Sequence, residues 1–363
     1  MIRKILSLGL ARTAALVMLL ACNACLAVLL LSDYPVVADI VTPLTGHVIG
    51  FGLAAALGLV LKRFALTAMG AGVALTLAFH TWLGLQPARF PAPQLAAVNA
   101  STATKEGQDI TIMSLNTWDA RDNVDQLIAY FSTAPADVVV LSEVGPPKRR
   151  LVQALRDVYP YQKECTDDWG CSIALLSRVP FDQGGTVRWS RQSPAFVWAR
   201  FPGSLTVVGT HIARPSRTPF LHAREADAVA QLVRRIDGSV VLVGDLNTSP
   251  WSYSFRSLKA QTGLTTARPL TPSWPAWPVN LPQVALDHIL VSQDLAFVES
   301  KTGPAVGSDH LPVFARLKRQ PTTVRRDPVR SGGSRLAALV PHLGGELLAD
   351  LGSKHHGAGH LGR

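Results

Sequence analysis

The feature that most constrains the fold is a series of short apolar runs between residues 110 and 317. Each run has four to six residues, which is the length of a buried strand, and helical patterns separate several of the runs. We predict strands at residues 110–115, 137–141, 173–176, 197–201, 205–210, 240–243, 286–291 and 313–317. We predict helices at residues 123–131, 147–158, 219–236 and 251–261. Eight or more strands in about 210 residues indicate one α/β domain rather than two.

Polar side chains lie at or beside the ends of six of these runs. They are Asn116, Glu143, His211, Asp245 with Asn247, Asp287, and Asp309 with His310. Each alone has an ordinary explanation, because a carboxylate or carboxamide after a strand commonly caps a helix or forms a turn. Together they would bring several like charges to one edge of a sheet, which destabilises a fold that has no cation to neutralise them.

The chemistry of this set predicts a site for a divalent metal ion. Oxygen ligands from asparagine and carboxylates suit Mg²⁺, Mn²⁺ or Ca²⁺, whereas zinc favours more histidine or cysteine. We therefore expect Mg²⁺ as the cofactor, with Mn²⁺ as an alternative.

The motifs that contain these residues follow one another as SLNTW, LSEV, a TH after a strand, GDLN, LDHILVS and SDHLPV. In this order they resemble the endonuclease/exonuclease/phosphatase superfamily, which is deoxyribonuclease-I-like, over about residues 108–318. That group includes pancreatic-type deoxyribonucleases, apurinic-site endonucleases, bacterial sphingomyelinases and inositol polyphosphate phosphatases. The resemblance implies a four-layer α/β sandwich, in which helices flank two packed mixed sheets and the site lies at one end of the sheets.

The resemblance also implies a role for each polar residue. Glu143 and Asn116 would hold the metal ion, which would bind a non-bridging phosphate oxygen. His310 would be the general base for the attacking water and would be oriented by a carboxylate. Asp309 beside it is an alternative ligand of the metal.

Four further residues complete the set that the resemblance implies. Asp245 and Asn247 would position the water and the phosphate. His211 would donate to a phosphate oxygen, and Asp287 would support one of the two histidines. These roles fit general chemistry, because phosphodiester hydrolysis concentrates negative charge on the phosphate oxygens and so needs a cation and donors. An imidazole with a pKa of about 6.5 is a suitable base near neutral pH.

The substrate is less constrained than the reaction. Arg214, Arg217 and Trp274 are weak candidates for substrate binding, because solvated arginines and packed tryptophans are the commoner explanation. The net charge of +10 suggests nucleic acid at first, but residues 90–317 hold 21 Lys and Arg against 20 Asp and Glu. The excess positive charge lies outside the predicted catalytic domain at 110–318, so charge does not indicate DNA binding.

The sequence therefore predicts a metal-dependent hydrolase of phosphodiester or phosphomonoester bonds. A nuclease proper and a phospholipid or sphingolipid hydrolase are alternatives with the same chemistry. A catalytically silent binding module is an alternative from another class. Its signature would be the loss of Asn116, Glu143, Asp245 or His310, and all four are present.

The N-terminal part contains three stretches without a charged residue, of 20, 22 and 25 residues. A helix needs about 20 residues to cross a bilayer, so we predict three transmembrane helices at about residues 13–32, 40–61 and 64–85. Basic residues before the first and between the second and third place the N-terminus in the cytoplasm. This predicts a multi-pass protein of the inner membrane, embedded in the lipid bilayer, with a periplasmic catalytic domain. Signal-peptide cleavage or lipoprotein processing at residues 19–22 is the alternative.

The remaining segments and cysteines are less informative. Residues 86–109 are rich in Pro, Ala and small polar residues and are predicted to be a linker. Residues 319–363 form a basic, His-rich tail that we expect to be disordered. Cys165 and Cys171 are six positions apart, and either close a small disulfide or remain a loop thiol and a buried thiol.

Overall fold

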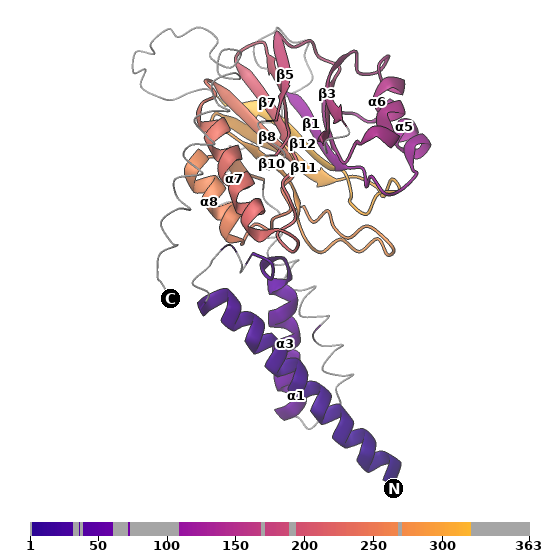
Figure 1. The fold of residues 1–363 in the computed structure, drawn as a ribbon, viewed down its shortest axis with the longest axis vertical. Helices are drawn as coiled ribbons and strands as arrows, with labels where there is room; N and C mark the ends of the chain where they lie inside the picture. The colour runs from indigo at the N-terminus through magenta and orange to yellow at the C-terminus, as the bar shows by residue number, and fades with distance from the viewer. Residues whose placement is uncertain are drawn as a thin grey trace, which may run out of the picture.

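The computed structural model describes residues 2–31, 39–60, 109–167, 171–188, 194–267 and 271–320, together with residues 36 and 72. In these ranges the chain forms a helical N-terminal segment and an α/β body with two six-stranded sheets (Figure 1). The predicted third span and the tail from residue 321 lie outside the described residues, as does the linker apart from residue 109.

The first sheet has the strand order β11-β12-β1-β2-β4-β3. Its strands are β1 (Ile110–Asn116), β2 (Val138–Ser142), β3 (Tyr161–Asp167), β4 (Cys171–Ser177), β11 (Leu295–Thr302) and β12 (Val313–Arg319). The pair β1 and β2 is parallel, and the other neighbouring pairs are antiparallel. The helix α5 (Val124–Thr133) connects the parallel pair. Both strands therefore end at the same edge of the sheet.

The second sheet repeats this plan with the order β5-β6-β7-β8-β10-β9. Its strands are β5 (Gln183–Val187), β6 (Phe196–Phe201), β7 (Leu205–Thr210), β8 (Ser239–Asp245), β9 (Thr265–Thr266) and β10 (Asp287–Val291). Here β7 and β8 are the parallel pair, and α7 (Pro219–Arg234) connects them. The neighbours β8 and β10 are antiparallel, so β10 begins where β8 ends.

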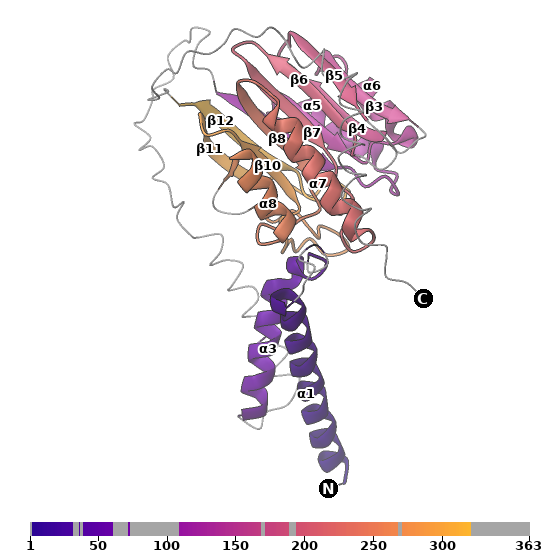
Figure 2. The ribbon, with the colours of Figure 1, turned by 60° about the vertical axis from the view of Figure 1, so that its left-hand side comes forward.

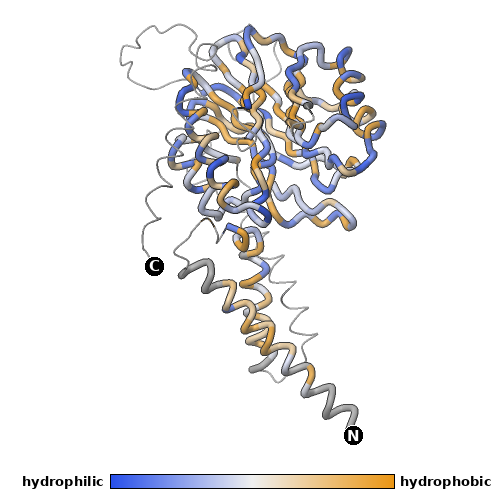
Figure 3. Tube along the Cα trace, in the orientation of Figure 1, coloured by the Kyte–Doolittle hydropathy of each residue, from blue (hydrophilic) through white to orange (hydrophobic). Residues whose placement is uncertain are grey.

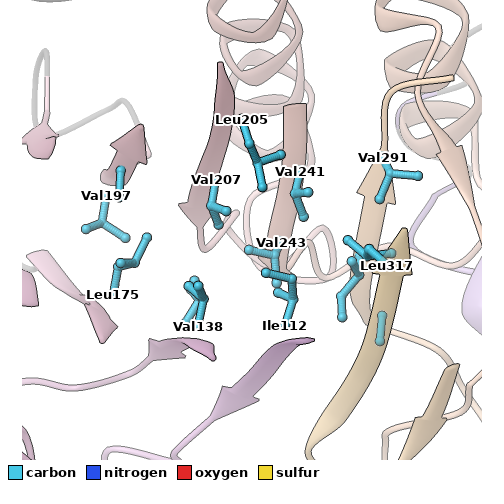
Figure 4. Close-up of a cluster of buried hydrophobic side chains, with 14 of the residues drawn as sticks. Ile112, Val138, Leu175, Val197, Leu205, Val207, Val241, Val243, Val291 and Leu317 are labelled. Atoms are coloured by element: carbon cyan, nitrogen blue, oxygen red, sulfur yellow. The ribbon is translucent and has the colours of Figure 1, made fainter. Parts of the chain in front are cut away.

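Helices cover the outer face of each sheet. Helices α5 and α6 (Arg149–Ala154) lie on the first sheet, and α7 and α8 (Tyr253–Thr262) lie on the second (Figures 1 and 2). Apolar side chains of both inner faces, Ile112 and Val241 among them, form the central core (Figure 4). Two outer clusters pack each sheet against its helices. The fold is thus an α/β sandwich of two mixed sheets flanked by helices, as the resemblance implies.

The predicted elements agree with the structure in the centre of each sheet. All eight predicted strands are present, and the tube in Figure 3 shows that these central strands are mostly hydrophobic. Four further strands, β3, β5, β9 and β11, were not predicted; the first three contain no apolar run, and β11 begins with a short one, Leu295 to Val298, that was not identified as a strand. They are the outermost strands of the two sheets, where one side has no neighbouring strand and polar residues are favoured. The predicted helix at 147–158 is shorter, consisting of a 3₁₀ turn (Pro146–Lys148) and α6.

The structure decides between the two interpretations of the cysteine pair. Cys165 on β3 and Cys171 on β4 form a disulfide, with their Cα atoms 5.3 Å apart. It ties the ends of two adjacent antiparallel strands at the edge of the first sheet. Cys22 and Cys25 are free thiols.

The prediction of membrane spans is corrected by the structure. The N-terminal segment forms α1 (Ile2–Leu31) and α3 (Thr45–Val60), which lie side by side (Figures 1 and 2). Within the described ranges, no helix combines the length and the apolar character needed to cross a membrane. In the second predicted span, counting uncharged residues overestimated the helix, because α3 has 16 residues and a crossing needs about 20. The predicted inner-membrane location and periplasmic catalytic domain are therefore wrong on this finding.

The N-terminal segment contacts the α/β body beside α8. The Asp39 carboxylate accepts hydrogen bonds from the backbone N–H groups of Tyr253 and Ser254, at 2.6 and 2.8 Å. These are the first residues of α8, whose amides have no partner within the helix. The Trp251 indole also donates to the carbonyl oxygen of Thr42. Asp39 thereby helps to cap the helix that follows the GDLN loop.

Candidate active site

The strand ends bring the predicted polar residues to one edge of the sandwich. Asn116 is the last residue of β1, and Glu143 directly follows β2. In the other sheet, Asp245 ends β8 and lies opposite Asp287, the first residue of β10. His211 directly follows β7. The parallel pair of each sheet, together with the antiparallel strand β10, therefore brings side chains from both sheets to the same edge of the sandwich.

Asn116 links the two sheets through its side-chain amide. Its Nδ2 donates to Glu143 Oε1 at 3.0 Å and to Asp245 Oδ2 at 2.9 Å. Its Oδ1 accepts the backbone N–H of Trp118 at 2.9 Å, which fixes the orientation of the amide. Asn116 is completely buried. Two carboxylates from different sheets therefore converge on one donor.

Glu143 is surrounded by donors. The backbone N–H of Asp119 donates to Oε2 at 3.0 Å, and Arg214 Nη2 donates to Oε1 at 3.2 Å. Burial alone would raise the pKa of Glu143. The pKa is nevertheless lowered below its ordinary value by the nearby charges and donors, of which His211 has the largest effect, followed by Asn116, the Asp119 amide and Arg214. Glu143 is consequently an anion at neutral pH and is available to a cation.

Asp287 and His310 form a buried pair. His310 Nδ1–H donates to Asp287 Oδ2 at 2.7 Å, and the Ser273 hydroxyl donates to the same oxygen at 2.6 Å. Burial would lower the pKa of His310, but Asp287 raises it, with contributions from Asp245 and Asp309, to about 9. The other imidazole nitrogen, Nε2, lies 4.0 Å from Asp245 Oδ2 and so faces the centre of the site.

Asp245 lies at the centre of the second-sheet residues. Its Oδ1 accepts the backbone N–H of Asn247 at 2.8 Å, and its Oδ2 lies 3.6 Å from His211 Nε2. The Asn247 side-chain Nδ2 lies 3.2 Å from His211 Nε2 and donates to the Ile212 carbonyl at 2.9 Å. Burial, followed by repulsion from Asp287, raises the pKa of Asp245.

Backbone strain is concentrated at this edge. Among the described residues, four non-glycine residues have a positive φ, and three of them, Trp118, Glu143 and Asn247, belong to the site or adjoin it. Such conformations cost on the order of 1–3 kcal/mol each and persist where surrounding contacts enforce them. Gly244 of the GDLN motif has φ 146°, and a Cβ atom there would lie 1.9 Å from the Thr210 carbonyl oxygen. The motif therefore requires glycine before Asp245.

With this geometry in view, comparison with known proteins identifies the family. The sequence model of the Endonuclease/Exonuclease/phosphatase family matches residues 113–310, which covers the strands and loops described above. The chain belongs to the endonuclease/exonuclease/phosphatase family. No curated protein matches the chain.

Solved structures of low sequence identity are also similar to the chain. The endonuclease/exonuclease/phosphatase from Bacteroides vulgatus is 15% identical, with a TM-score of 0.49, and covers 59% of this chain and 100% of its own. The protein of that description from Beutenbergia cavernae is 20% identical, with a TM-score of 0.47 and coverage of 62% and 75%. Sphingomyelinase C from Streptomyces griseocarneus is 20% identical, with a TM-score of 0.42 and coverage of 58% and 99%.

The structure does not bring every predicted residue of this family site together. Arg214 contacts Glu143, whereas no contact of the described residues joins the side chains of Arg217 or Trp274 to the carboxylates. Arg217 closes a turn through its backbone N–H to the Arg214 carbonyl, and Trp274 forms an isolated bridge with Val284. The carbonyl oxygen of Asp309 accepts the Ala276 N–H at 2.7 Å. The negative charge of the Asp309 carboxylate contributes to the raised pKa of His310.

Three supporting residues were not found from the sequence. Lys148 is buried, and its Nζ donates to the carbonyl oxygens of Thr117 and Trp118, the latter at 2.6 Å. Burial lowers its pKa to about 8. The Ser308 hydroxyl donates to the Asn116 carbonyl at 2.6 Å and accepts the His310 N–H at 3.1 Å. Ser308 and Ser273 were visible only as small polar residues beside motifs, and Lys148 gave no signal because a lysine in a helical pattern usually faces solvent.

Two groups of residues at this edge could hold a cation. Asp245, Asp287 and His310 offer ligand atoms within 4.8 Å of one another. In that group, however, His310 Nδ1 and Asp287 Oδ2 are already bonded to each other. Glu143 and Asp245 instead direct two carboxylate oxygens at the Asn116 amide, in the oxygen-rich setting that Mg²⁺ or Mn²⁺ prefers. The Glu143 carboxylate fits the cofactor that the sequence predicts, whereas the side-chain oxygen of Asn116, its only possible ligand atom, accepts the Trp118 N–H, and its Nδ2 faces the carboxylates.

Proposed function

We propose that this protein is a divalent-metal-dependent phosphoesterase that hydrolyses phosphodiester or phosphomonoester bonds by direct attack of water. The observation that carries this proposal is the buried Asp287–His310 pair, whose free imidazole nitrogen faces Asp245 beside the Asn116–Glu143 group. A candidate base and a carboxylate that can bind a cation, both close to Asp245, are the groups that catalyse attack of water on a phosphate.

Glu143 holds the metal ion in this proposal, with Asp309 as a further candidate ligand, and Asn116 joins them as a ligand only if its Oδ1 leaves the Trp118 N–H. Mg²⁺ or Mn²⁺, when bound, supplies positive charge to the phosphate oxygens as a Lewis acid. The hydrogen bonds from Arg214 and the Asp119 amide keep the Glu143 carboxylate ionised and oriented. Asn116 fixes the distance between Glu143 and Asp245 through its shared amide.

His310 is the general base in this proposal. Nε2 removes a proton from the attacking water, and the Asp287 carboxylate stabilises the imidazolium through Nδ1. Because the pKa of His310 is raised to about 9, the imidazole must lose its own Nε2 proton before it can act. We therefore expect activity to rise with pH above neutrality.

His211, Asn247 and Asp245 position the reacting groups. His211 Nε2 lies 3.2 Å from Asn247 Nδ2 and can donate to a phosphate oxygen, whereas Asn247 Nδ2 donates to the Ile212 carbonyl and to Asp245 and so holds this loop in position. Asp245 Oδ2 lies between His211 and His310 and can accept a hydrogen bond from the water. The assembly of these groups with Asn116 and Glu143 favours an enzyme over a catalytically silent binding module.

The proposal is tested with bis(p-nitrophenyl) phosphate as a chromogenic substrate and the full chain as the enzyme. We expect hydrolysis with Mg²⁺ or Mn²⁺, abolition by EDTA, and loss of activity in His310→Ala. The matched control is His288→Gln, which changes a buried histidine that contacts the Thr248 carbonyl and faces away from the site. Hydrolysis that survives EDTA, or that is unchanged in His310→Ala, contradicts the proposal. Plasmid DNA and phospholipid vesicles in the same assay distinguish the nuclease and lipid-hydrolase alternatives.

A further inference from the structure

Two tryptophans and an arginine form a stacked group beside the site. The rings of Trp118 and Trp277 have centroids 5.2 Å apart and an interplanar angle of 51°. The Arg121 Cζ atom lies 5.4 Å from the Trp118 ring centroid and 6.0 Å from that of Trp277. We call these three residues the aromatic platform. It joins the loop after β1 to the segment that precedes β10.

Backbone hydrogen bonds attach the aromatic platform to the proposed catalytic residues. The Trp118 N–H donates to Asn116 Oδ1 at 2.9 Å, and Lys148 Nζ donates to the Trp118 carbonyl at 2.6 Å. On the other side, the N–H of Ala276, next to Trp277, donates to the Asp309 carbonyl at 2.7 Å. Asn116 thus holds the backbone at Trp118, and Asp309 holds the backbone next to Trp277, so both tryptophans are tied to residues of the site.

Packing alone does not explain the aromatic platform. Trp277 is 49% exposed, so its indole does not serve the core. Trp118 has φ 57°, a conformation that is strained for a bulky residue and that holds its ring against Trp277. Exposed aromatic surface held in place by backbone strain beside a reactive site is typical of a binding surface.

We propose that the aromatic platform binds a planar aromatic group carried by the phosphate ester substrate, such as a nucleobase. This inference rests on the proposed phosphoesterase function and names the substrate class for that site. The aromatic group stacks on the exposed face of Trp277, because stacking on tryptophan accepts any flat π-system. Arg121 adds positive charge next to the stacked ring, where the phosphate of such a substrate enters the site.

Three methyl phosphodiesters, which share no aromatic leaving group such as p-nitrophenol, test the proposal. They are the methyl phosphodiesters of thymidine (through its 5′-oxygen), phenol and methanol, assayed with Mg²⁺ by ³¹P NMR. We expect Trp277→Ala to raise KM about tenfold for the thymidine and phenyl esters, with kcat retained and little change for the methyl ester. Trp277→Phe restores most of the lost affinity, since it keeps a flat ring. The control Val279→Ala, in the same loop and 67% exposed, leaves all three KM values unchanged.

The outcomes separate this proposal from the proposed function. An equal change in KM for the methyl and thymidine esters in Trp277→Ala overturns the aromatic platform while leaving the phosphoesterase intact. An effect on thymidine alone restricts the ligand to a nucleobase. If no ester is hydrolysed, the proposed function fails, and thymidine 5′-monophosphate binding is measured by quenching of tryptophan fluorescence. Binding that is weakened in Trp277→Ala then still supports the platform, and equal or absent binding overturns it.

Discussion

The two sheets contribute parts of the site that have similar backbones, but the pKa shifts of Glu143 in the first sheet and Asp245 in the second have opposite signs. Each sheet supplies a parallel pair connected by a helix, β1 with β2 and β7 with β8. At the first pair, donors surround Glu143 and lower its pKa. At the second, buried carboxylates face one another, and the pKa of Asp245 is raised. The same architecture thus provides a stable anion for a cation after β2 and, at the start of β10, the carboxylate that pairs with His310 from the loop before β12.

The Asp287–His310 pair, which joins the start of β10 in the second sheet to the loop before β12 of the first, should show the largest effect when its base is removed. His310→Ala is expected to lower kcat by about 10³-fold, because general-base catalysis contributes about 10²- to 10⁴-fold. Added Mg²⁺ should not restore the rate, since the variant retains Glu143 and Asn116. The measurement is kcat against Mg²⁺ concentration, with His288→Gln as control. If added Mg²⁺ restored the kcat of His310→Ala, His310 would be a ligand of the metal ion rather than the base that deprotonates water.

The first sheet should respond differently to the loss of its charge. Glu143→Gln is expected to raise the Mg²⁺ concentration needed for half-maximal activity by about 10- to 100-fold, in the range seen when metal coordination is weakened. Activity should recover in part at high Mg²⁺. The control is Asp182→Asn, which also replaces a carboxylate by a carboxamide, at an exposed residue. An unchanged Mg²⁺ requirement in Glu143→Gln would place the cation elsewhere.

The pH profile sharpens the role of the Asp287–His310 pair. We expect kcat/KM to rise with pH through an apparent pKa between 6.5 and about 9, because His310 acts only after it loses a proton. Asp287→Asn removes the charge that stabilises the imidazolium, so the apparent pKa should fall and kcat should drop about tenfold or more. A profile that stays in place in Asp287→Asn would contradict the assignment of His310 as the base.

The smallest expected effect concerns folding stability and arises from Glu225 on α7, the helix that connects β7 and β8 of the second sheet. Glu225 on α7 is buried and accepts the Ala213 N–H at 2.6 Å, and burial raises its pKa from 4.5 to about 7. Between these values the folded protein holds a proton that the unfolded chain has lost, so the free energy of unfolding falls as pH rises from 4.5 to 7. The fall should be on the order of 2 kcal/mol. Denaturant titrations should show that Glu225→Gln flattens this dependence, and an unaltered slope would exclude Glu225 as its source.

The sequence predicted the parts of the fold and the site that depend on local pattern. Central strands are buried on both faces, so their apolar runs were recognisable, and the polar residues that follow them mark the edge where Asn116, Glu143 and Asp245 meet. Outer strands such as β3 carry the polar residues of a sheet edge and gave no such pattern.

Contacts between distant segments could not be derived in this way. The pairing of Asp287 with His310 rather than His211 depends on how the β10 start faces the loop before β12. Burial of Lys148 and the stacking of Trp118 on Trp277 likewise depend on tertiary packing. The predicted spans failed for a related reason, because a count of uncharged residues does not establish the length of the helix they form.

Metal binding by two variants tests the division of roles between Glu143 and the Asp287–His310 pair most directly. Mn²⁺ titrated calorimetrically into the full chain should bind to the wild type and to His310→Ala with similar affinity. Glu143→Gln should bind it at least about tenfold more weakly. If His310→Ala loses Mn²⁺ binding while Glu143→Gln retains it, the cation belongs to the Asp245–Asp287–His310 group, and a cation site built on the first sheet is contradicted.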